Sequence, residues 1–128
     1  MNISEVSKKF ELTQDTLRYY ERIGMIPHVN RTSSGIRDYT EEDCKWVQLA
    51  KCMRSAGLPV EVMIEYLKLT QQGDETITVR HELLIEQREK LLIKKIAIES
   101  TIDRLNYKIG RYEKAVETGV LVWDSDEV

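Results

Sequence analysis

The sequence predicts a mainly α-helical protein in which a head of short helices is followed by one long helix. Start and stop signals of short helices recur through residues 1–70, whereas residues 76–118 contain no proline and a single glycine, Gly110. Aromatic residues make up 7% of the chain, which is few for an all-β sandwich, and 32% of residues are charged, which suits long solvated helices. We therefore expect a head domain at 1–70, a long helix at 76–118 and an acidic tail at 119–128.

The first short helix is predicted to follow Asn2. An asparagine side chain can accept a hydrogen bond from the first turn of a helix and so cap it. Ile3, Val6 and Phe10 then fall on one face at helical spacing. Residues 11 and 12 leave room only for a tight connection to the next helix.

The second short helix is predicted to begin after Thr13 and to run to about Ile23. Leu17 and Tyr20 point inward in this helix, and Gly24 with the proline at position 27 ends it. Two short helices joined by a turn of three or four residues resemble a helix-turn-helix, although this turn lacks the glycine that such turns often contain.

A small β-hairpin is predicted for residues 28–39. Two segments, 29–32 and 36–39, flank Ser33, Ser34 and Gly35, and glycine can take the positive φ that a hairpin turn needs. A hairpin directly after a helix-turn-helix would form a protruding wing.

Two further helices complete the head. Thr40 and Asp43 form a capping-box pattern, a hydroxyl at the N-cap and an acid three residues later, and the helix that they start stops at Gly57. Pro59 suits the first turn of a fourth helix, which ends near residues 70–73.

The long helix carries an apolar seam. One seam position holds Leu84, Leu91, Ile98, Leu105 and Tyr112, and the other holds Ile102, Ile109 and Val116, with Arg88 and Lys95 interrupting the second position. Forty-three helical residues extend roughly 64 Å. The head is too small to bury an apolar seam of this length, and we therefore expect a homodimer with paired long helices. The alternative is a helix that folds back on its own chain.

Charge, hydropathy and the absence of certain motifs limit the classes of protein to which the chain can belong. The net charge is −3, but residues 1–57 have a balance of +1 and residues 58–128 a balance of −4, which permits a basic face on the head. The absence of an 18-residue apolar run excludes a membrane-spanning helix, and the N-terminus lacks a secretion signal, so we expect a cytoplasmic protein without a membrane partner. The two histidines, His28 and His81, lie far apart, and no phosphate-binding glycine loop occurs, so we expect no enzyme activity.

The second helix carries the strongest functional pattern. Four residues recur on its outward face: Gln14, Asp15, Arg18 and Arg22. A helix that enters the major groove of DNA needs such a face, because arginines reach phosphates or guanine edges and polar residues near the helix start meet bases. Arg31 and Arg37 bracket the hairpin. The alternative is a solvated charged face in which Asp15 pairs with Arg18 and Glu21 with Arg22.

Residues 1–70 resemble the DNA-binding domain of MerR-family transcription regulators. The matching elements, in order, are Thr16-Leu17-Arg18-Tyr19-Tyr20-Glu21, Gly24-Met25-Ile26, Arg31, Ser34-Gly35-Ile36-Arg37-Asp38-Tyr39-Thr40-Glu41-Glu42-Asp43, and Gly57 before Leu58. The order, spacing and residue types agree over more than half of the chain. The long C-terminal helix fits the antiparallel dimerisation coil of the family.

The resemblance implies a winged helix-turn-helix DNA-binding domain followed by a long C-terminal helix that forms an antiparallel dimeric coiled coil. Each subunit would read half of a palindromic promoter with a long spacer, and distortion of the DNA by the activated dimer would realign the two elements for RNA polymerase. The DNA-binding residues would be Gln14, Thr16, Arg18, Tyr19 and, by its place on the same face, Arg22, with Arg31, Ser34, Gly35 and Arg37 in the wing and Tyr39 supporting it.

The kinds of signal to which such a regulator can respond are limited by residues that the sequence lacks. Two cysteines cannot build a four-cysteine iron–sulfur cluster. In the family that the sequence resembles, copper- and mercury-type members place thiols at the start of the coil and in a loop after it, whereas residues 76–82 and 112–122 contain no thiol and only His81 as a soft ligand. About ten residues follow the coil, too few for the drug-binding domain of the multidrug-sensing members. We therefore expect no metal site and no cofactor.

A thiol is then the candidate sensor. Cys44 and Cys52 are about 12 Å apart along one helix and cannot form a disulfide within the chain. Lys45, Lys51 and Arg54 lie near Cys52 in sequence, and nearby cations favour the reactive thiolate. The region resembles the AdhR and NmlR branch of the family, which senses aldehydes and thiol stress, so Cys52 is predicted to respond to an electrophile or oxidant.

Three alternatives stay open. Cys52 can instead be a small apolar residue that fills a gap, as buried cysteines often do. The protein can be a MerR-type regulator that senses a metabolite or a partner protein without cysteine chemistry. Finally, it can be a coiled-coil interaction module whose head recognises another protein. For Cys44, a filler or surface role is expected.

Overall fold

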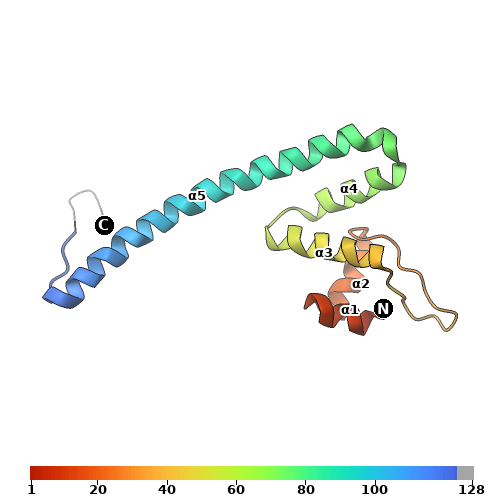
Figure 1. Cartoon of the computed structure of the whole chain (residues 1–128), viewed down its shortest axis with the longest axis horizontal. Coiled ribbons are helices and arrows are strands. Elements are labelled where there is room, and N and C mark those ends of the chain that lie inside the picture. The colour runs from red at the N-terminus through yellow and green to blue at the C-terminus, as the bar shows by residue number, and fades with distance from the viewer. Residues whose placement is uncertain (124–128) are drawn as a thin grey trace. The chain divides into compact units, whose positions relative to one another are not determined.

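The computed structural model describes residues 1–123, and within that range every regular element is helical (Figure 1). The elements, in chain order, are α1 (Ile3–Phe10), α2 (Gln14–Ile23), α3 (Glu41–Ser55), α4 (Val60–Gln72), the short 3₁₀ helix η1 (Asp74–Thr76) and α5 (Ile77–Thr118). The mainly α fold and the position of each predicted helix are thus confirmed to within two or three residues. Residues 124–128 of the predicted acidic tail lie outside the described residues.

The chain divides into two compact units, Met1–Gln87 and the part that follows from Arg88. The first unit holds α1 to α4, η1 and the beginning of α5, and the second holds the rest of α5 and the segment after it. The predicted division at residues 70 and 76 therefore differs from the compact units, because the first turns of α5 belong to the first unit.

Local capping explains where the helices of the first unit begin. Asn2 and Thr40 each form a complete capping box, in which the N-cap side chain accepts from the third helical N–H and the acid there, Glu5 or Asp43, accepts from the N-cap N–H. Thr13 caps α2 by accepting from Thr16 N at 3.1 Å. The three N-caps predicted from the sequence are therefore confirmed.

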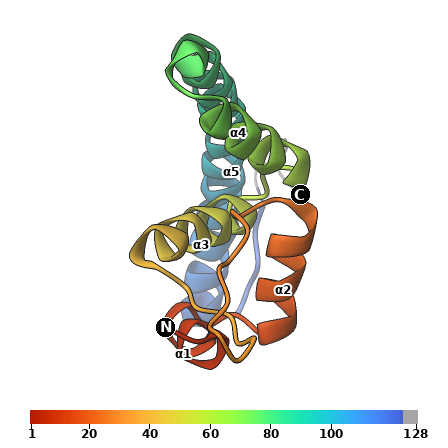
Figure 2. The ribbon, with the colours of Figure 1, turned by 90° about the vertical axis from the view of Figure 1, so that its right-hand side faces the viewer.

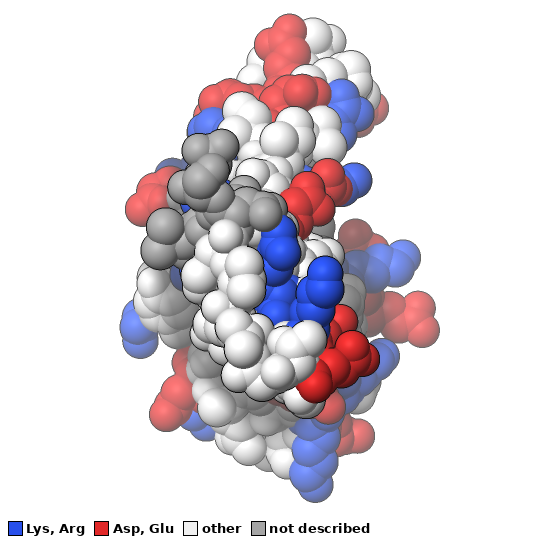
Figure 3. Space-filling model, turned by 90° about the vertical axis from the view of Figure 1, so that its left-hand side faces the viewer, with Lys and Arg blue, Asp and Glu red and all other residues white. Residues whose placement is uncertain are grey.

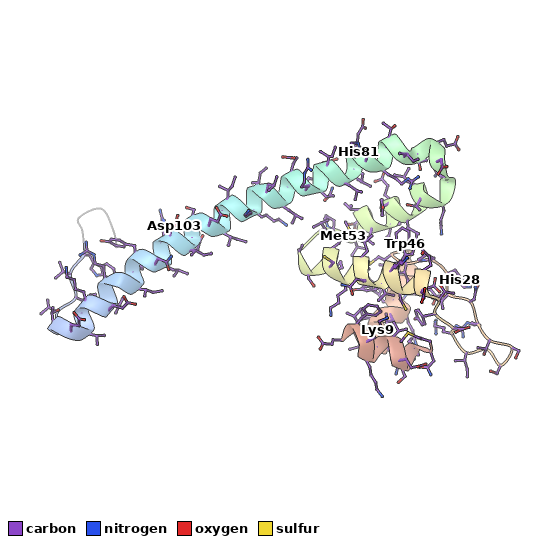
Figure 4. All side chains as sticks on the ribbon, in the orientation of Figure 1. Lys9, His28, Trp46, Met53, His81 and Asp103 are labelled. Carbon is purple, nitrogen blue, oxygen red and sulfur yellow. The ribbon has the colours of Figure 1, made fainter. Side chains whose placement is uncertain are left out.

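The core of the first unit is formed by side chains of α1 to α4 and of the segment after α2, elements whose arrangement Figure 2 shows. The largest fully buried side chains come from α1 to α4 and the segment after α2: Leu17, Met25, Ile26, Met63, Val6, Val29 and Val47. On α2, Leu17 and Tyr20 point inward as predicted, with 0% and 6% of their surface exposed. Trp46 of α3 packs on Tyr66 of α4, with ring centroids 5.7 Å apart (Figure 4).

The predicted β-hairpin is wrong in its strands. Residues 28–39 form a loop with one isolated antiparallel bridge, between Arg31 and Arg37, and the described part of the chain contains no strand. Two backbone bonds close the loop, from Thr32 N to Ile36 O and from Asp38 N to Asn30 O, both 2.7 Å. Within the two segments only the outer ends, Val29 and Tyr39, are buried, and residues 30–36 are exposed. A two-stranded ladder without a third strand or a continuous buried face does not extend. We call this loop the wing.

The second unit is one helix with an uncovered apolar seam. Ile98, Ile102, Leu105 and Ile109 are each about half exposed, and Val116 is 85% exposed. After α5 the chain turns, and Trp123 packs on Tyr107 and Tyr112 of the helix, with ring centroids 6.5 and 5.8 Å apart. Basic and acidic side chains are interspersed on the face seen from this end of α5 (Figure 3).

Candidate nucleic-acid interface

The outward face of α2 presents a linked set of polar side chains. The burial of Leu17 and Tyr20 fixes the rotation of α2, so that Gln14, Asp15 and Arg18 face outward. The Arg18 guanidinium donates through Nη1 to Asp15 Oδ1 at 2.9 Å and through Nη2 to Gln14 Oε1 at 3.3 Å. The pairing of Asp15 with Arg18 that the sequence suggested is confirmed.

Further along the same face, an aromatic ring lies beside a cation. Tyr19 is 40% exposed, and the Arg22 guanidinium lies 5.4 Å from the centre of its ring. The suggested pair between Glu21 and Arg22 is wrong. Glu21 lies on the side of α2 that faces the wing, whereas Arg22 lies beside Tyr19 and is exposed.

Glu21 is the junction between α2 and the wing. Its side chain is 8% exposed; Oε1 accepts from Arg37 Nε at 2.8 Å, and Oε2 accepts from Val29 N at 3.1 Å and lies 3.1 Å from His28 Nδ1. A single carboxylate therefore joins α2 to the entry and to the exit of the wing.

The ionisation of Glu21 follows from these contacts. Burial alone would raise the pKa of this carboxyl group, but the hydrogen bonds from Arg37 and Val29 N, with the charges of Arg37 and His28, outweigh burial and lower the pKa. Glu21 is therefore ionised at neutral pH and forms a charge-assisted hydrogen bond with Arg37.

The tip of the wing is held by short-range bonds. Arg31 Nη1 donates to Gly35 O at 2.7 Å, and the Ser34 hydroxyl lies 3.0 Å from that of Thr32. Gly35 has φ +85°, which glycine adopts without the strain that a side chain would bring. Arg31, Ser34 and Gly35 are all exposed, as residues that contact a ligand must be.

Arg37, predicted as a contact of the wing with DNA, and Tyr39, predicted to support the wing, both lie in the base of the wing. Arg37 has 21% of its side chain exposed and is paired with Glu21, and Tyr39 is 3% exposed. The Tyr39 hydroxyl is buried without a hydrogen-bond partner in the described chain, and this burial raises its pKa, against a smaller opposing effect of Arg37. Tyr39 N donates to Met1 O at 2.7 Å, which fixes the end of the wing. Both residues, Arg37 and Tyr39, are thus placed to hold the wing in position.

The two cysteines differ in accessibility. Cys44 is buried, in keeping with a filler, and Cys52 is exposed, so the filler interpretation of Cys52 is wrong. The cations near Cys52 in sequence are bound elsewhere: Lys51 Nζ donates to Phe10 O and Arg54 Nη1 to Leu58 O, both at 2.6 Å, while Lys45 lies 3.9 Å from Glu42. Each of these three cations thus has a hydrogen-bond or ion-pair partner other than the thiol.

Within residues 1–123, histidine, cysteine and acidic side chains do not gather in threes as a metal ion would require. His28 contacts Glu21, and His81 is exposed on α5. None of the helices described combines the length and apolar composition that crossing a membrane requires.

A helix-turn-helix followed by a loop tied to its second helix defines a winged helix-turn-helix head, and comparison with known proteins identifies the family. A profile of MerR HTH family regulatory proteins matches residues 1–70. The chain belongs to this family, and it is a DNA-binding transcriptional regulator.

Individual relatives indicate the branch. The HTH-type transcriptional regulator AdhR of Bacillus subtilis (strain 168) is 54% identical over 92 residues, which span 72% of the chain and 66% of that relative. A MerR family transcriptional regulator from Listeria monocytogenes superposes with a TM-score of 0.88 at 40% identity, covering 93% of this chain and 90% of the other. HiNmlR, described as lacking the sensor domain and bound to promoter DNA, superposes with a TM-score of 0.81 at 30% sequence identity. The match covers 94% of this chain and 95% of the other. The chain is thus AdhR/NmlR-like, and these relatives are regulators, not enzymes.

Proposed function

We propose that the protein acts as a homodimer that binds a palindromic promoter, with one head on each half-site. The observation that carries this proposal is the Glu21 junction, because it fixes α2 and the wing as one surface with Arg18, Arg22 and Arg31 on it. The relative HiNmlR, which is described as bound to promoter DNA, supports the same use of this head.

The residues proposed for DNA contact follow from exposure. Gln14, Thr16, Arg18, Tyr19 and Arg22 lie on α2 and would meet the major groove, although the Thr16 hydroxyl also lies 2.7 Å from that of Thr13 in the helix cap. In the wing, Arg31, Ser34 and Gly35 would contact the backbone, and Arg37 and Tyr39 would hold the wing in position.

The exposed seam of α5 supports the proposed dimer. Apolar side chains repeat at heptad spacing from Ile98 to Val116, and each has between 47% and 85% of its surface exposed. A helix that exposes such a stripe gains stability when a second copy covers it. The resemblance to the family implies that the two helices run antiparallel, which would hold the heads at a fixed separation.

Activation would use the DNA itself. By resemblance to the family, the promoter would have a long spacer, and the dimer would distort it so that its two elements align for RNA polymerase. Bending a site of this size costs a few kcal/mol, which backbone contacts by the two heads can supply. Determining the operator sequence would test this step directly, because a spacer of ordinary length would contradict it.

The first test is a salt titration of binding to the chain's own promoter. Affinity should fall steeply with salt, since phosphate contacts release counterions. Arg18→Ala should weaken specific binding by about 1–3 kcal/mol if Arg18 contacts a base in bidentate fashion. Arg104→Ala removes the same charge from an exposed position of α5 and serves as the control. Binding that is indifferent to salt, or equal effects of both variants, would contradict the proposed interface.

For the signal, we propose that Cys52 reacts with an electrophile such as an aldehyde, or with an oxidant. The exposure of this thiol and the similarity to AdhR support the assignment.

A thiol-labelling experiment tests this assignment. A maleimide or aldehyde probe should modify Cys52 about ten times faster than Cys44 in the folded protein, because the buried Cys44 reacts only after local opening. The variants Cys44→Ser and Cys52→Ser assign each rate, and labelling in denaturant equalises them. Faster labelling of Cys44 in the folded protein would overturn the assignment.

A second sensing mechanism is separable from the first. If Cys52→Ala leaves induction normal, the regulator responds to a metabolite or a partner protein instead. An interaction module whose head recognises another protein is disfavoured, because the family is one of DNA-binding regulators.

A further inference from the structure

Asp15 is an acidic side chain on the face that the proposed function places against DNA, and the inference below rests on that function. Its side chain is 96% exposed and lies one helical turn before Arg18, which bonds to it at 2.9 Å. A carboxylate on a surface that approaches phosphates is repelled by them, so its presence there needs a compensating contact.

Folding alone gives little reason for an acid at this position. Thr13 already caps α2, and Asp15 makes no capping bond. An acid in the first turn interacts favourably with the helix dipole, but the gain is small for a fully exposed group. The Arg18 pair is an exposed i,i+3 salt bridge, a kind of contact that contributes little to stability.

The hydrogen-bonding groups of the pair match the edge of one base pair. In the major groove, guanine shows two acceptors, N7 and O6, beside the N4 amino donor of cytosine. Arg18 presents several N–H donors, and Asp15 lies directly beside it with two acceptor oxygens. Oδ1 accepts from Arg18, and Oδ2 makes no hydrogen bond within residues 1–123. The other terminal nitrogen of Arg18, Nη2, donates to Gln14 Oε1, so both terminal nitrogens of the guanidinium are held by residues of the same helix.

We propose that Asp15 and Arg18 together read one G·C base pair in each half-site, with Arg18 donating to guanine and Asp15 accepting from the amino group of cytosine. Arg18 alone also binds phosphates, which any sequence offers. Asp15 opposes that mode through repulsion, and beyond its bond to Arg18 it gains a further compensating contact only where a cytosine amino group meets it. Asp15 is thus a specificity-determining residue, and its removal should raise affinity for unrelated DNA while it lowers discrimination.

The test measures equilibrium binding of the full chain to its promoter and to duplexes that carry each of the four base pairs at every half-site position. The wild type should prefer G·C at one position by roughly 5- to 150-fold. Asp15→Ala should reduce that preference to a few-fold, leave preferences elsewhere unchanged, and bind an unrelated duplex more tightly. Asp15→Asn, which keeps the shape, should also bind unrelated DNA more tightly.

Glu61→Ala is the matched control, because Glu61 is an exposed acid in the first turn of α4 and its removal changes the net charge equally. It should leave every base preference unchanged. Circular dichroism of each variant checks that α2 still folds. If Asp15→Ala binds the promoter with all preferences intact, the inference is wrong while the proposed function stands. If the wild type itself shows no preference among duplexes, the proposed function fails, and the inference fails with it.

Discussion

Ile102→Glu is expected to convert the protein into a monomer and to abolish specific binding to promoter DNA at concentrations where the wild type is saturated. Ile102 lies in the middle of the apolar seam of α5 and is 47% exposed in the single chain. In a dimer, each copy would bury one unpaired carboxylate, which costs several kcal/mol per group. Because two linked heads bind one duplex far more tightly than one head does, loss of pairing removes this gain as well.

Sedimentation equilibrium and DNA titration measure the two effects separately. Ser100→Glu adds the same charge to α5 outside the seam and should remain dimeric with unchanged DNA affinity. A wild-type chain that sediments as a monomer at working concentration would refute the proposed dimer. An Ile102→Glu dimer with normal binding would show that the seam is not the interface.

Glu21→Ala is expected to lower the free energy of unfolding by about 3 kcal/mol and to weaken DNA binding through the wing. Removing one partner of a buried ion pair leaves the other without compensation, which is a strongly destabilising change. Arg37, 21% exposed, loses its acceptor, and so does Val29 N. Chemical denaturation at one fixed protein concentration measures the loss, since the stability of a dimer depends on concentration. Glu42→Ala, which breaks an exposed pair at 3.9 Å, is the control and should cost less than about 1 kcal/mol.

The same carboxylate gives the stability of the protein a defined dependence on pH. The pKa of Glu21 is lower in the folded state than in the unfolded chain, so its contribution is complete above the unfolded value and is lost as the pH falls through the folded value. Stability should therefore decline below about pH 4, the range in which a free glutamate titrates. In Glu21→Gln this part of the decline should be missing, and an unchanged acid profile would contradict the role of Glu21.

Helix positions were predictable because their signals are local. Asn2, Thr13 and Thr40 each act on N–H groups within three residues, and Gly24 ends α2 in the left-handed conformation that a glycine favours. The inward direction of Leu17 and Tyr20 follows from helical spacing. The exposure of the α2 residues opposite them followed from the same spacing, which is why most candidate interface residues lie on the surface.

What the sequence did not reveal depends on pairs that lie far apart along the chain. Glu21 and Arg37 are separated by 16 residues, and nearby Arg22 was an equally plausible partner by charge. Lys51 sits next to Cys52 in sequence, yet its amine reaches the carbonyl of Phe10, 41 residues away. Charge and spacing indicate which groups can pair, but tertiary packing decides which pairs form.

The Glu21 junction also affects how each head meets DNA. Because the buried carboxylate of Glu21, a residue of α2, bonds to both ends of the wing, the distance between α2 and the wing is set before DNA arrives. The conformational entropy lost in ordering the wing is then spent during folding and is not subtracted from binding. A rigid pair of contacts also rejects duplexes whose local groove width does not match, so part of the selectivity should come from DNA shape at positions that no side chain reads.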